Sequence, residues 1–366
     1  MIRTYLPKNT EELIHWYERY ISPLALIAGF LIDNFFLLDR VDVVFGNILL
    51  FSYLVLAAAC IVLLNYVESG KTRNSYVLSV APFVPVAMQL AFGALFSGYL
   101  ALYSKSASIA VSWIFVFAIA ALLIGNERFR RSYTQLPFQV AILYTALFSF
   151  LIFILPVIFK SIGPAMFLLS GAVGLFVMTL FLLVLHSLMP ERFDPARTKI
   201  ARIIAVLFVT FNVLYFLNLI PPLPLALKDA GVYHSITRSG FEYTLSYEPL
   251  PWYKRYFNYN TQFHRAPSES AYVFTSIFAP TGLETRVVHE WQYFDEPTGE
   301  WLTRTVVDFI ISGGRDQGFR GYSQKGTLEE GKWRVNVKTQ YGQLIGRVSF
   351  SVIDAPEIVS LETEVR

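Results

Sequence analysis

Asp33 is the side chain with the clearest potential for chemistry, because its carboxyl group lies inside an otherwise apolar run of residues. A charge at the centre of a bilayer costs roughly 2.5–3.5 kcal/mol on insertion scales, so such a carboxylate needs a partner or a water-filled cavity. Ser22, Ala25 and Gly29 fall on the same helical face as Asp33 and form a small, polar stripe. Such stripes are typical of helix–helix contacts. Asp33 is therefore either a charge-dependent site or a packing residue, and Asp33→Asn would distinguish the two.

Further amide side chains lie in apolar runs and are expected at a similar depth to Asp33 or near the bilayer midplane. If these groups converge, they outline a polar pocket that opens toward the outer side of the membrane. The alternative is hydrogen bonding between helices, which contributes roughly 0.6–2 kcal/mol for each bond and fixes packing. The predicted intramembrane polar cluster consists of Asp33, Asn34, Asn47, Gln89, Asn212 and Asn218.

Three histidines, His234, His264 and His289, follow the last apolar run. Three imidazoles can hold zinc, but no two of these have the close spacing that is typical of zinc ligands. His289 alternates with Val287 and Trp291, which favours a hydrogen-bonded core histidine. No nucleophile elbow, P-loop, dinucleotide fingerprint or HExxH motif occurs, so we predict no catalytic residue, no metal and no cofactor.

Aromatic and basic residues are dense between residues 252 and 265. Three interpretations stay open for this stretch: an anchor in the lipid headgroup region, packing against a neighbouring β domain, or a platform that stacks on a ligand such as a sugar. The candidate interface residues are Trp252, Tyr253, Lys254, Arg255, Tyr256 and Arg265.

The composition indicates a membrane protein. Of 366 residues only 16% are charged, against roughly 25% in soluble domains, and the mean hydropathy is +0.47. The net charge of +3 gives no reason to expect nucleic acid as a partner, and a single cysteine, Cys60, excludes an intrachain disulfide.

Backbone groups must be satisfied within each membrane segment, so the apolar runs should be helices. Seven such runs occur: Ile21–Leu38, Val41–Val67, Tyr76–Tyr103, Ala107–Gly125, Phe138–Phe159, Ala165–Leu188 and Ile200–Ile220. Kinks are expected at Pro82, Pro85 and Pro156.

The charges between these runs predict the orientation. Twelve lysines and arginines lie before the first run and in alternate loops, whereas the remaining short loops hold three. The positive-inside rule then places the N-terminus in the cytoplasm. Residues 1–20 are expected to form a cytoplasmic interfacial helix, and residues 21–220 a seven-helix domain in contact with membrane lipids. Seven crossings of a bacterial inner membrane deliver everything after Ile220 to the periplasm.

From Ala271 onward apolar and polar residues alternate, which is typical of strands. Tyr341-Gly342 has the composition of a hairpin turn. The spacing of the strands predicts an Ig-like antiparallel sandwich over residues 271–366, preceded by an aromatic and basic connector over 221–270. The expected strands are Tyr272–Phe278, Thr285–Phe294, Leu302–Ile311, Phe319–Lys325, Trp333–Thr339 and Leu344–Val352.

The stretch GKWRVNVKTQYGQLIGRVSFSV is similar to the bacterial family "domain of unknown function 2914". The residues that carry the resemblance are Gly331, Trp333, Arg334, Val335, Val337, Gly342, Gly346, Phe350 and Val352, with His289-Glu290-Trp291 and Tyr322-Ser323-Gln324-Lys325 upstream. PPLPLALKDAGVYH and ISPLALIAGF resemble the membrane-anchored members. The resemblance implies an architecture and no activity.

Two functions from different classes follow. The preferred hypothesis is a non-enzymatic inner-membrane protein whose periplasmic sandwich binds a partner protein or an envelope polymer. The alternative is a transporter or a lipid- or glycan-modifying enzyme that uses the polar cluster around Asp33. A sensor is disfavoured, because the short cytoplasmic loops leave no room for an output domain.

Overall fold

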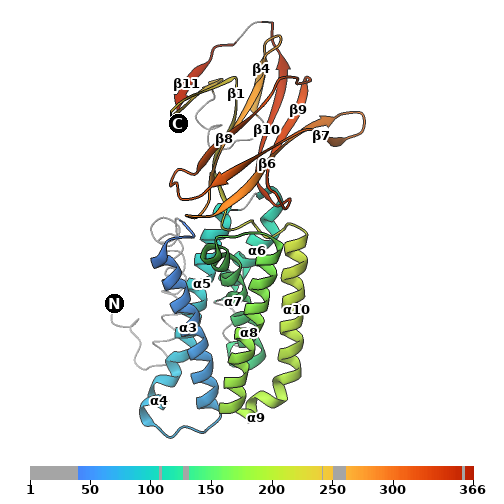
Figure 1. Ribbon diagram of the computed structural model, residues 1–366. Coiled ribbons are helices and arrows are strands. Elements are labelled where there is room, and N and C mark those ends of the chain that lie inside the picture. Colours follow the sequence, from blue (N-terminus) through green and yellow to red (C-terminus); the bar gives the residue numbers. More distant parts are fainter. Residues whose placement is uncertain (1–39, 107–108, 127–131, 241, 250–260, 357–358) are drawn as a thin grey trace, which may run out of the picture. The chain divides into compact units, whose positions relative to one another are not determined.

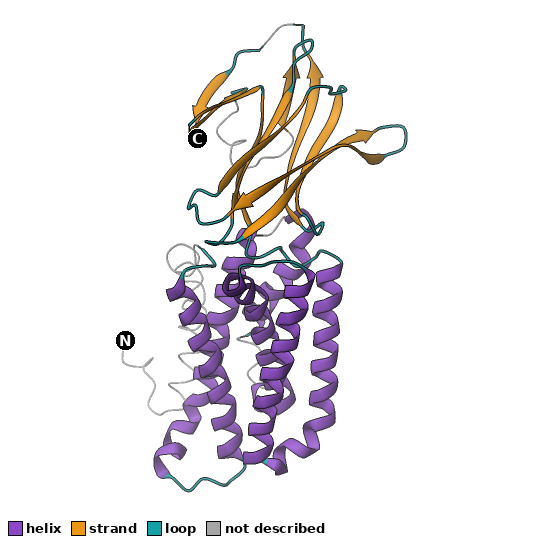
Figure 2. Ribbon diagram, viewed as in Figure 1, coloured by secondary structure: helices purple, strands orange, loops and turns teal. Residues whose placement is uncertain are grey.

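The computed structural model describes residues 40–106, 109–126, 132–240, 242–249, 261–356 and 359–366. The chain divides into two compact units, and the second unit takes in Pro221–Arg366. Every described helix precedes Ile220 and every described strand follows Pro221 (Figures 1 and 2). We refer to them as the helical unit and the β unit.

Six of the seven predicted apolar runs coincide with described helices. The seventh, Ile21–Leu38, lies outside the described residues, as does the predicted interfacial helix of residues 1–20. Five of the described helices are long and apolar enough to cross a membrane, and α6 is shorter. The helices are α3 (Val44–Glu68), α4 (Ser75–Val80), η3 (Ala81–Phe83), α5 (Val84–Ser106), α6 (Ile109–Gly125), α7 (Leu136–Phe159), α8 (Pro164–Leu188), α9 (Pro190–Phe193), η5 (Asp194–Ala196) and α10 (Arg197–Phe216).

Most described prolines of the helical unit lie at helix starts, because proline has no N–H group to donate to the preceding turn. The third predicted run changes to a 3₁₀ turn, η3, which contains Pro82, and Pro85 lies in the first turn of α5, where no amide partner is lost. Pro156 does not end α7, which continues to Phe159. Pro164 and Pro190 begin α8 and α9.

Helix α7 lies at the centre of the helical unit, and the other long helices present apolar surface outward. In α7, 67% of the apolar window is buried, whereas in the other four long helices the fraction lies between 22% and 33%. Phe117, Phe176 and Val206 are among the exposed side chains. A soluble unit does not leave so much apolar surface in water, so this exterior suits lipid.

Two alternate loops meet at one end of the helical unit. Arg192, in α9, pairs with Glu68 at the end of α3 at 2.5 Å. Lys71 Nζ donates to the carbonyl oxygen of Leu188 at 3.0 Å. These contacts bring residues 69–74 and 189–196 to the same end of the helical unit, and the compartment that this end faces stays a prediction.

The β unit contains all six predicted strands, each within two residues of its expected bounds. The predicted turn is also present: Gly342 adopts a φ of +85°, and its N–H donates to the carbonyl oxygen of Thr339. The strands are β1 (Ala226–Tyr233), β2 (Ser235–Ser239), β3 (Glu242–Tyr247), β4 (Thr261–Arg265), β5 (Ala271–Phe278), β6 (Glu284–Asp295), β7 (Glu300–Ser312), β8 (Phe319–Lys325), β9 (Gly331–Thr339), β10 (Leu344–Asp354) and β11 (Glu362–Val365).

These strands form three sheets, with the orders β1-β5-β8, β4-β10-β9-β6-β7 and β11-β3-β2. The first two sheets enclose a core around Trp291, Trp333 and Phe350. The other side of the β1-β5-β8 sheet contacts β3 through Tyr233, Tyr243, Leu245 and Phe274. Strand β5 is therefore covered on both faces, which explains why its sequence is a nearly continuous buried run rather than a clean alternation.

Three expectations need correction. The sandwich is not purely antiparallel, because β4 pairs with β10 in parallel. The connector predicted over residues 221–270 supplies the four strands β1–β4, because its apolar residues are buried in the cores of the β unit. Strand β1 joins the first sheet, β4 joins the second, and β2 and β3 form the third with β11. The last long helix ends at Phe216 rather than Ile220, because Asn218 adopts a left-handed φ of +58°. The Ig-like subclass stays a prediction.

Candidate functional site

The four described members of the predicted intramembrane polar cluster make no hydrogen bond with one another. Asn47 Nδ2 donates to the carbonyl oxygen of Val41, and Asn212 Nδ2 to that of Phe208, each at 2.8 Å. Asn218 follows the end of α10 and has a left-handed backbone, and Gln89 is buried. Asp33 and Asn34 lie outside the described residues, so the convergence of all six stays a prediction.

A different polar network is buried in the helical unit. Asn65 Nδ2 donates to Gln139 Oε1 at 2.6 Å, and Gln139 Nε2 donates to the carbonyl oxygen of Tyr133. The hydroxyl of Tyr133 donates to Asn126 Oδ1, and Asn126 Nδ2 donates to the carbonyl oxygen of Gln89 at 2.8 Å. This network joins the end of α3 to the start of α7, so on the predicted topology it lies toward the cytoplasm rather than in the outer half. Its bonds link residues that are distant in sequence, which favours a packing role, although Asn65 Oδ1 is buried without a hydrogen-bond partner.

The predicted aromatic and basic interface falls almost entirely on residues 250–260, outside the described residues. Its one described member, Arg265, ends β4. Its Nη2 contacts Asp354 Oδ1 at 2.5 Å, and its Nη1 donates to the carbonyl oxygen of Leu328. Arg265 thus joins β4 to β10 and to the loop before β9.

His289 is the hydrogen-bonded core histidine that the sequence favours. It is fully buried, with Nε2 at 3.1 Å from Thr275 Oγ1 and Nδ1 at 2.9 Å from Ser323 Oγ. Burial lowers the pKa of His289 to about 4. The ring is therefore neutral near pH 7 and takes part in the core rather than in a site.

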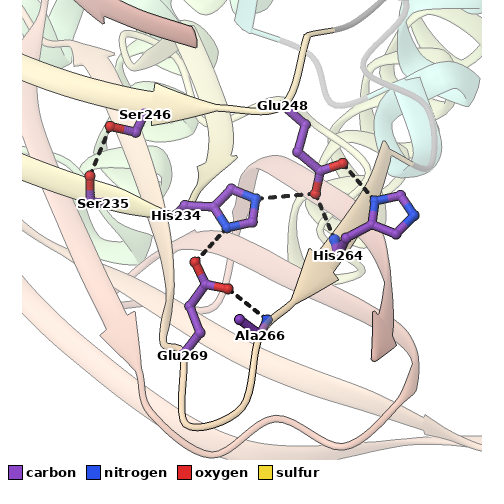
Figure 3. Close-up of polar contacts among 7 residues, drawn as sticks. All are labelled: His234, Ser235, Ser246, Glu248, His264, Ala266 and Glu269. Carbon is purple, nitrogen blue, oxygen red and sulfur yellow. Dashed lines mark hydrogen bonds and ion pairs between the residues drawn. The ribbon is translucent and has the colours of Figure 1, made fainter. Parts of the chain in front are cut away.

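The other two histidines meet through two glutamates, and we call His234, Glu248, His264 and Glu269 the His–Glu cluster. His234 follows β1, Glu248 follows β3, His264 lies on β4, and Glu269 lies between β4 and β5. Pairing of β2 with β3 places Glu248 opposite the turn at His234, since His234 N donates to the carbonyl oxygen of Ser246. Figure 3 shows both glutamates pointing toward the His234 ring.

The His234 ring lies between two carboxylates. Nδ1 is 2.6 Å from Glu269 Oε1 and Nε2 is 3.1 Å from Glu248 Oε1. The side chain is only 3% exposed, and its ring stacks on Phe263 with centroids 4.2 Å apart. A neutral imidazole has one N–H donor, whereas two ionised carboxylates require two. The geometry therefore fits an imidazolium.

Glu248 joins the two histidines. Its Oε1 accepts the backbone N–H of His264 at 2.6 Å, and its Oε2 lies 2.7 Å from His264 Nδ1. The outer carboxylate, Glu269, accepts the N–H of Ala266 at 2.8 Å through Oε2. The cluster thus fixes β4, an edge strand, to the ends of β1 and β3.

Charge and hydrogen bonding set the protonation states of the cluster. Burial by itself would lower the pKa of His234, but the hydrogen bonds and charges of Glu248 and Glu269 outweigh it and raise that pKa above its ordinary value. Burial would raise the pKa of Glu248, but hydrogen bonds from His234 and His264 outweigh it and lower that pKa. The protonated histidine and ionised glutamate stabilise each other.

A pocket of about 270 Å³ lies beside the cluster, between the edges of β1, β4, β10 and β11. His234, Glu248 and Phe263 form part of its wall, and the side chains of Tyr233 and Tyr247 add hydroxyl groups. Arg366 Nε lies 3.5 Å from Asp229 Oδ2 and also contacts Glu364. The other polar lining residues are Asp229, Thr261, Gln262, Ser349, Glu364 and Arg366.

This arrangement offers polar groups that can bind a ligand. Both ring nitrogens of His234 are engaged, and only His264 presents a nitrogen, Nε2, that has no hydrogen bond among the described residues. The described residues hold no group of three or more histidine, cysteine, aspartate or glutamate side chains that could hold a metal ion. The pocket does offer hydroxyl, carboxylate and guanidinium groups to a polar ligand.

Sequence reasoning identified His234 and His264 as candidates but not their partners Glu248 and Glu269. Glu248 and Glu269 lie 14 and 35 residues from His234, and no periodicity links them. The one sequence feature that could have pointed to these glutamates is the high density of charged and aromatic residues between 242 and 269.

Comparison with known proteins supports the resemblance seen in the C-terminal sequence. The family model described as "Protein of unknown function (DUF2914)" matches residues 284–352, which run from β6 into β10. No curated protein matches the chain. A solved structure of Pseudomonas fluorescens alkylpurine DNA glycosylase AlkC, bound to DNA containing an abasic site analog, aligns at 13% identity over 79% of this chain and 80% of that chain. The TM-score of this alignment is 0.20.

Proposed function

We propose, taking residues 284–352 as a DUF2914 domain, that this is a multi-pass inner-membrane protein whose β unit lies in the periplasm and binds a partner protein or an envelope polymer. The helical unit supplies the anchor, since its long helices carry apolar exteriors of membrane-spanning length. The β unit supplies the binding surface.

The observation that carries the binding assignment is the pocket beside the His–Glu cluster. Its wall contains three carboxylates, those of Asp229, Glu248 and Glu364, against the cations Arg366 and His234. Such a lining can hydrogen-bond the hydroxyl groups of a glycan or the backbone of an extended peptide. Its described lining residues include no aligned pair of nucleophile and base of the kind that a hydrolytic site requires.

The orientation rests on the distribution of charge and on the contacts between loops. The Glu68–Arg192 pair and the Lys71–Leu188 bond bring two loops that are rich in arginine and lysine to the same end. The positive-inside rule favours the cytoplasm for that end. The alternative, a transporter or membrane enzyme, depends on the predicted cluster around Asp33.

Cysteine labelling tests the orientation. In a Cys60→Ser background we would place cysteines at Gln340, an exposed position of the β unit, and at Glu191, in the loop between α8 and α10. A membrane-impermeant maleimide should label Gln340→Cys in cells with a permeabilised outer membrane, and Glu191→Cys only after lysis. The reverse pattern would refute the periplasmic assignment.

Photo-crosslinking tests the binding. A photoreactive amino acid at Gln262, in the pocket wall, should give a discrete adduct with a protein or polymer of the envelope. The matched control is Thr298, an exposed residue in the turn between β6 and β7. Equal yields at the two positions, or none at Gln262, would count against a ligand in the pocket.

A further inference from the structure

The outer face of the five-stranded sheet carries a second polar arrangement, which we call the arginine face: Glu290, Gln292, Arg334, Asn336, Lys338 and Arg347. In β9, Trp333 and Val335 point into the core, so Arg334, Asn336 and Lys338 point away from it. Antiparallel pairing then places Arg334 opposite Gln292, and Asn336 between Glu290 and Arg347.

Each arginine of this face uses only one of its donor groups. Arg334 Nε donates to Gln292 Oε1, and Arg347 Nε donates to Asn336 Oδ1, both at 2.7 Å. Asn336 Nδ2 in turn donates to Glu290 Oε2 and Gln292 Oε1, each at 3.0 Å. The terminal nitrogens of both guanidinium groups have no hydrogen bond among the described residues, although the groups are held in fixed positions.

Cations outnumber anions on this face. Glu290 is its only carboxylate, and Lys338 Nζ already contacts it at 2.5 Å. Both guanidinium groups are half-buried, so water compensates them only in part. Burial and then the charge of Arg347 lower the pKa of Arg334 to about 10. Two guanidinium groups that repel each other at fixed positions would gain from a shared anion.

The surroundings suit a planar or ring-shaped ligand. The Arg334 guanidinium lies 4.1 Å from the centroid of the Trp301 ring, and the Phe294 and Trp301 rings lie 5.1 Å apart. A sheet face is open, so a small anion would stay largely hydrated there. A polymer with repeated acidic groups could contact several cations at once and gain from multivalency.

We propose that the arginine face binds an acidic polysaccharide, with Arg334 and Arg347 donating their terminal N–H groups to one carboxylate or phosphate group. Guanidinium groups bind such groups with two parallel hydrogen bonds, which lysine cannot match. The face lies within residues 284–352, and it is distinct from the pocket beside His234. The inference deepens the proposed function, on which it rests for the location of the β unit.

Binding is measured with the full chain in detergent, so that the result does not depend on membrane orientation. The probes are polygalacturonate as the carboxylate source, a phosphate-bearing glycan such as a teichoic acid as the phosphate source, and dextran as the neutral reference. We expect the chain to bind one of the two acidic polymers and not dextran. Binding to neither acidic polymer, or equal binding to dextran, would overturn the assignment and would leave the topology test unaffected.

Variants of the face locate the binding. Arg334→Gln with Arg347→Gln should weaken binding about tenfold or more, since hydrogen bonds to charged groups are lost. Arg334→Lys with Arg347→Lys keeps the charge and should recover only part of it. Arg286→Gln is the matched control, because Arg286 is an exposed arginine that is paired with Asp308 at 2.7 Å. An unchanged affinity of the double glutamine variant, or an equal loss in Arg286→Gln, would contradict the proposal. If the double glutamine variant fails to fold, Glu290→Gln decides, because removing the only carboxylate should strengthen binding.

Discussion

Replacing His234 with glutamine tests the His–Glu cluster as a charged assembly. The substitution keeps a side chain of similar size that can donate one hydrogen bond, but it removes the positive charge. Glu269 and Glu248 then face each other across an uncharged amide, 2.6 and 3.1 Å from where the ring nitrogens were. The substitution should therefore destabilise the β unit and leave the helical unit unchanged.

The magnitude follows from burial and from the number of bonds lost. Each hydrogen bond to a charged group contributes about 1.5–3 kcal/mol, and removing one partner of a buried ion pair costs about 3–5 kcal/mol. His234 is 3% exposed and its two partners 16% and 17%. Glutamine retains one neutral bond, so we expect a loss of about 3 kcal/mol. Since domains are stable by about 5–15 kcal/mol, a loss of this size is readily measured.

The pH dependence identifies the charge. The pKa of His234 is raised in the folded state, so its contribution is fully present below the ordinary histidine pKa of 6.5 and is lost as the pH rises through the raised value. The pKa of Glu248 is lowered, so its contribution is present above the ordinary value of 4.5 and is lost as the pH falls through the lowered value. The cluster is therefore expected to stabilise the β unit most between about pH 4.5 and 6.5.

His289 acts in the opposite direction and must be separated. Its pKa is about 4 in the core, so it contributes stability above the unfolded value of 6.5 that is lost as the pH falls toward 4. The difference between 4 and 6.5 corresponds to about 3 kcal/mol. The stability of the parent chain is thus a sum of two opposed histidine effects. Subtracting the His234→Gln profile from that of the parent removes the effect of His289, because both chains contain it.

The assay is a thermolysin pulse during urea unfolding of the full chain in detergent, between about pH 5.5 and about pH 8.5. The protease cleaves the β unit only where it has unfolded. The free-energy difference between parent and His234→Gln should be largest at the acid end and should shrink as the pH rises. A difference that stays constant over this range would mean that folding does not shift the pKa of His234, and a difference that grows as the pH rises would mean that the ring is uncharged in the folded state. Either result would refute the reasoning.

Two smaller perturbations test packing in each unit. Gly313→Ala should destabilise the β unit by about 1–3 kcal/mol, because a Cβ at this position would lie 1.9 Å from the carbonyl oxygen of Pro280. The control Gly326→Ala should change the free energy of unfolding by less than about 0.5 kcal/mol, because a Cβ there makes only an ordinary van der Waals contact. The urea assay above measures both variants. Gln139→Leu should lower the free energy of unfolding of the helical unit by about 1–3 kcal/mol, because Asn65 Nδ2 loses the bond to Gln139 Oε1. An unchanged melting temperature in detergent would show that the buried network is dispensable.

Local signals were sufficient for most elements of the fold. Six apolar runs are helical, because helix formation in an apolar environment depends only on the run itself. The alternation of Trp333 and Val335 with Arg334 and Asn336 predicted strand β9 and also which side of it is buried. The bounds of α10 were the exception, since nothing in the sequence marked Asn218 as left-handed.

The first four strands were missed because β1, β3 and β4 have pairing partners that are distant in sequence, and β2 pairs, among the described strands, only with β3. Strand β4 pairs with β10, about ninety residues later, and β3 pairs with β11 near the end of the chain. Strand β4 has only five residues, TQFHR, and β2 is largely exposed, so neither has a strong pattern of its own. Phe263 lies in the stretch of residues 252–265 for which three interpretations stayed open, and it is a core residue of the β unit.

The candidate sites differ in how far a sequence could predict them, and the difference has a physical basis. The arginine face consists of alternate residues on long strands, so the period of two in β6, β9 and β10 already assigns its side chains to one surface. The His–Glu cluster depends instead on a short edge strand, on two strand ends and on a turn. None of these has a periodicity, and only the pairing of β4 with β10 and of β2 with β3 brings His234 to Glu248 and Glu269. The folded chain assembles the cluster, and the charged hydrogen bonds of His234 in turn stabilise the segments that they join. A change that discharges His234 should therefore loosen β4 and the pocket wall beside it at the same time.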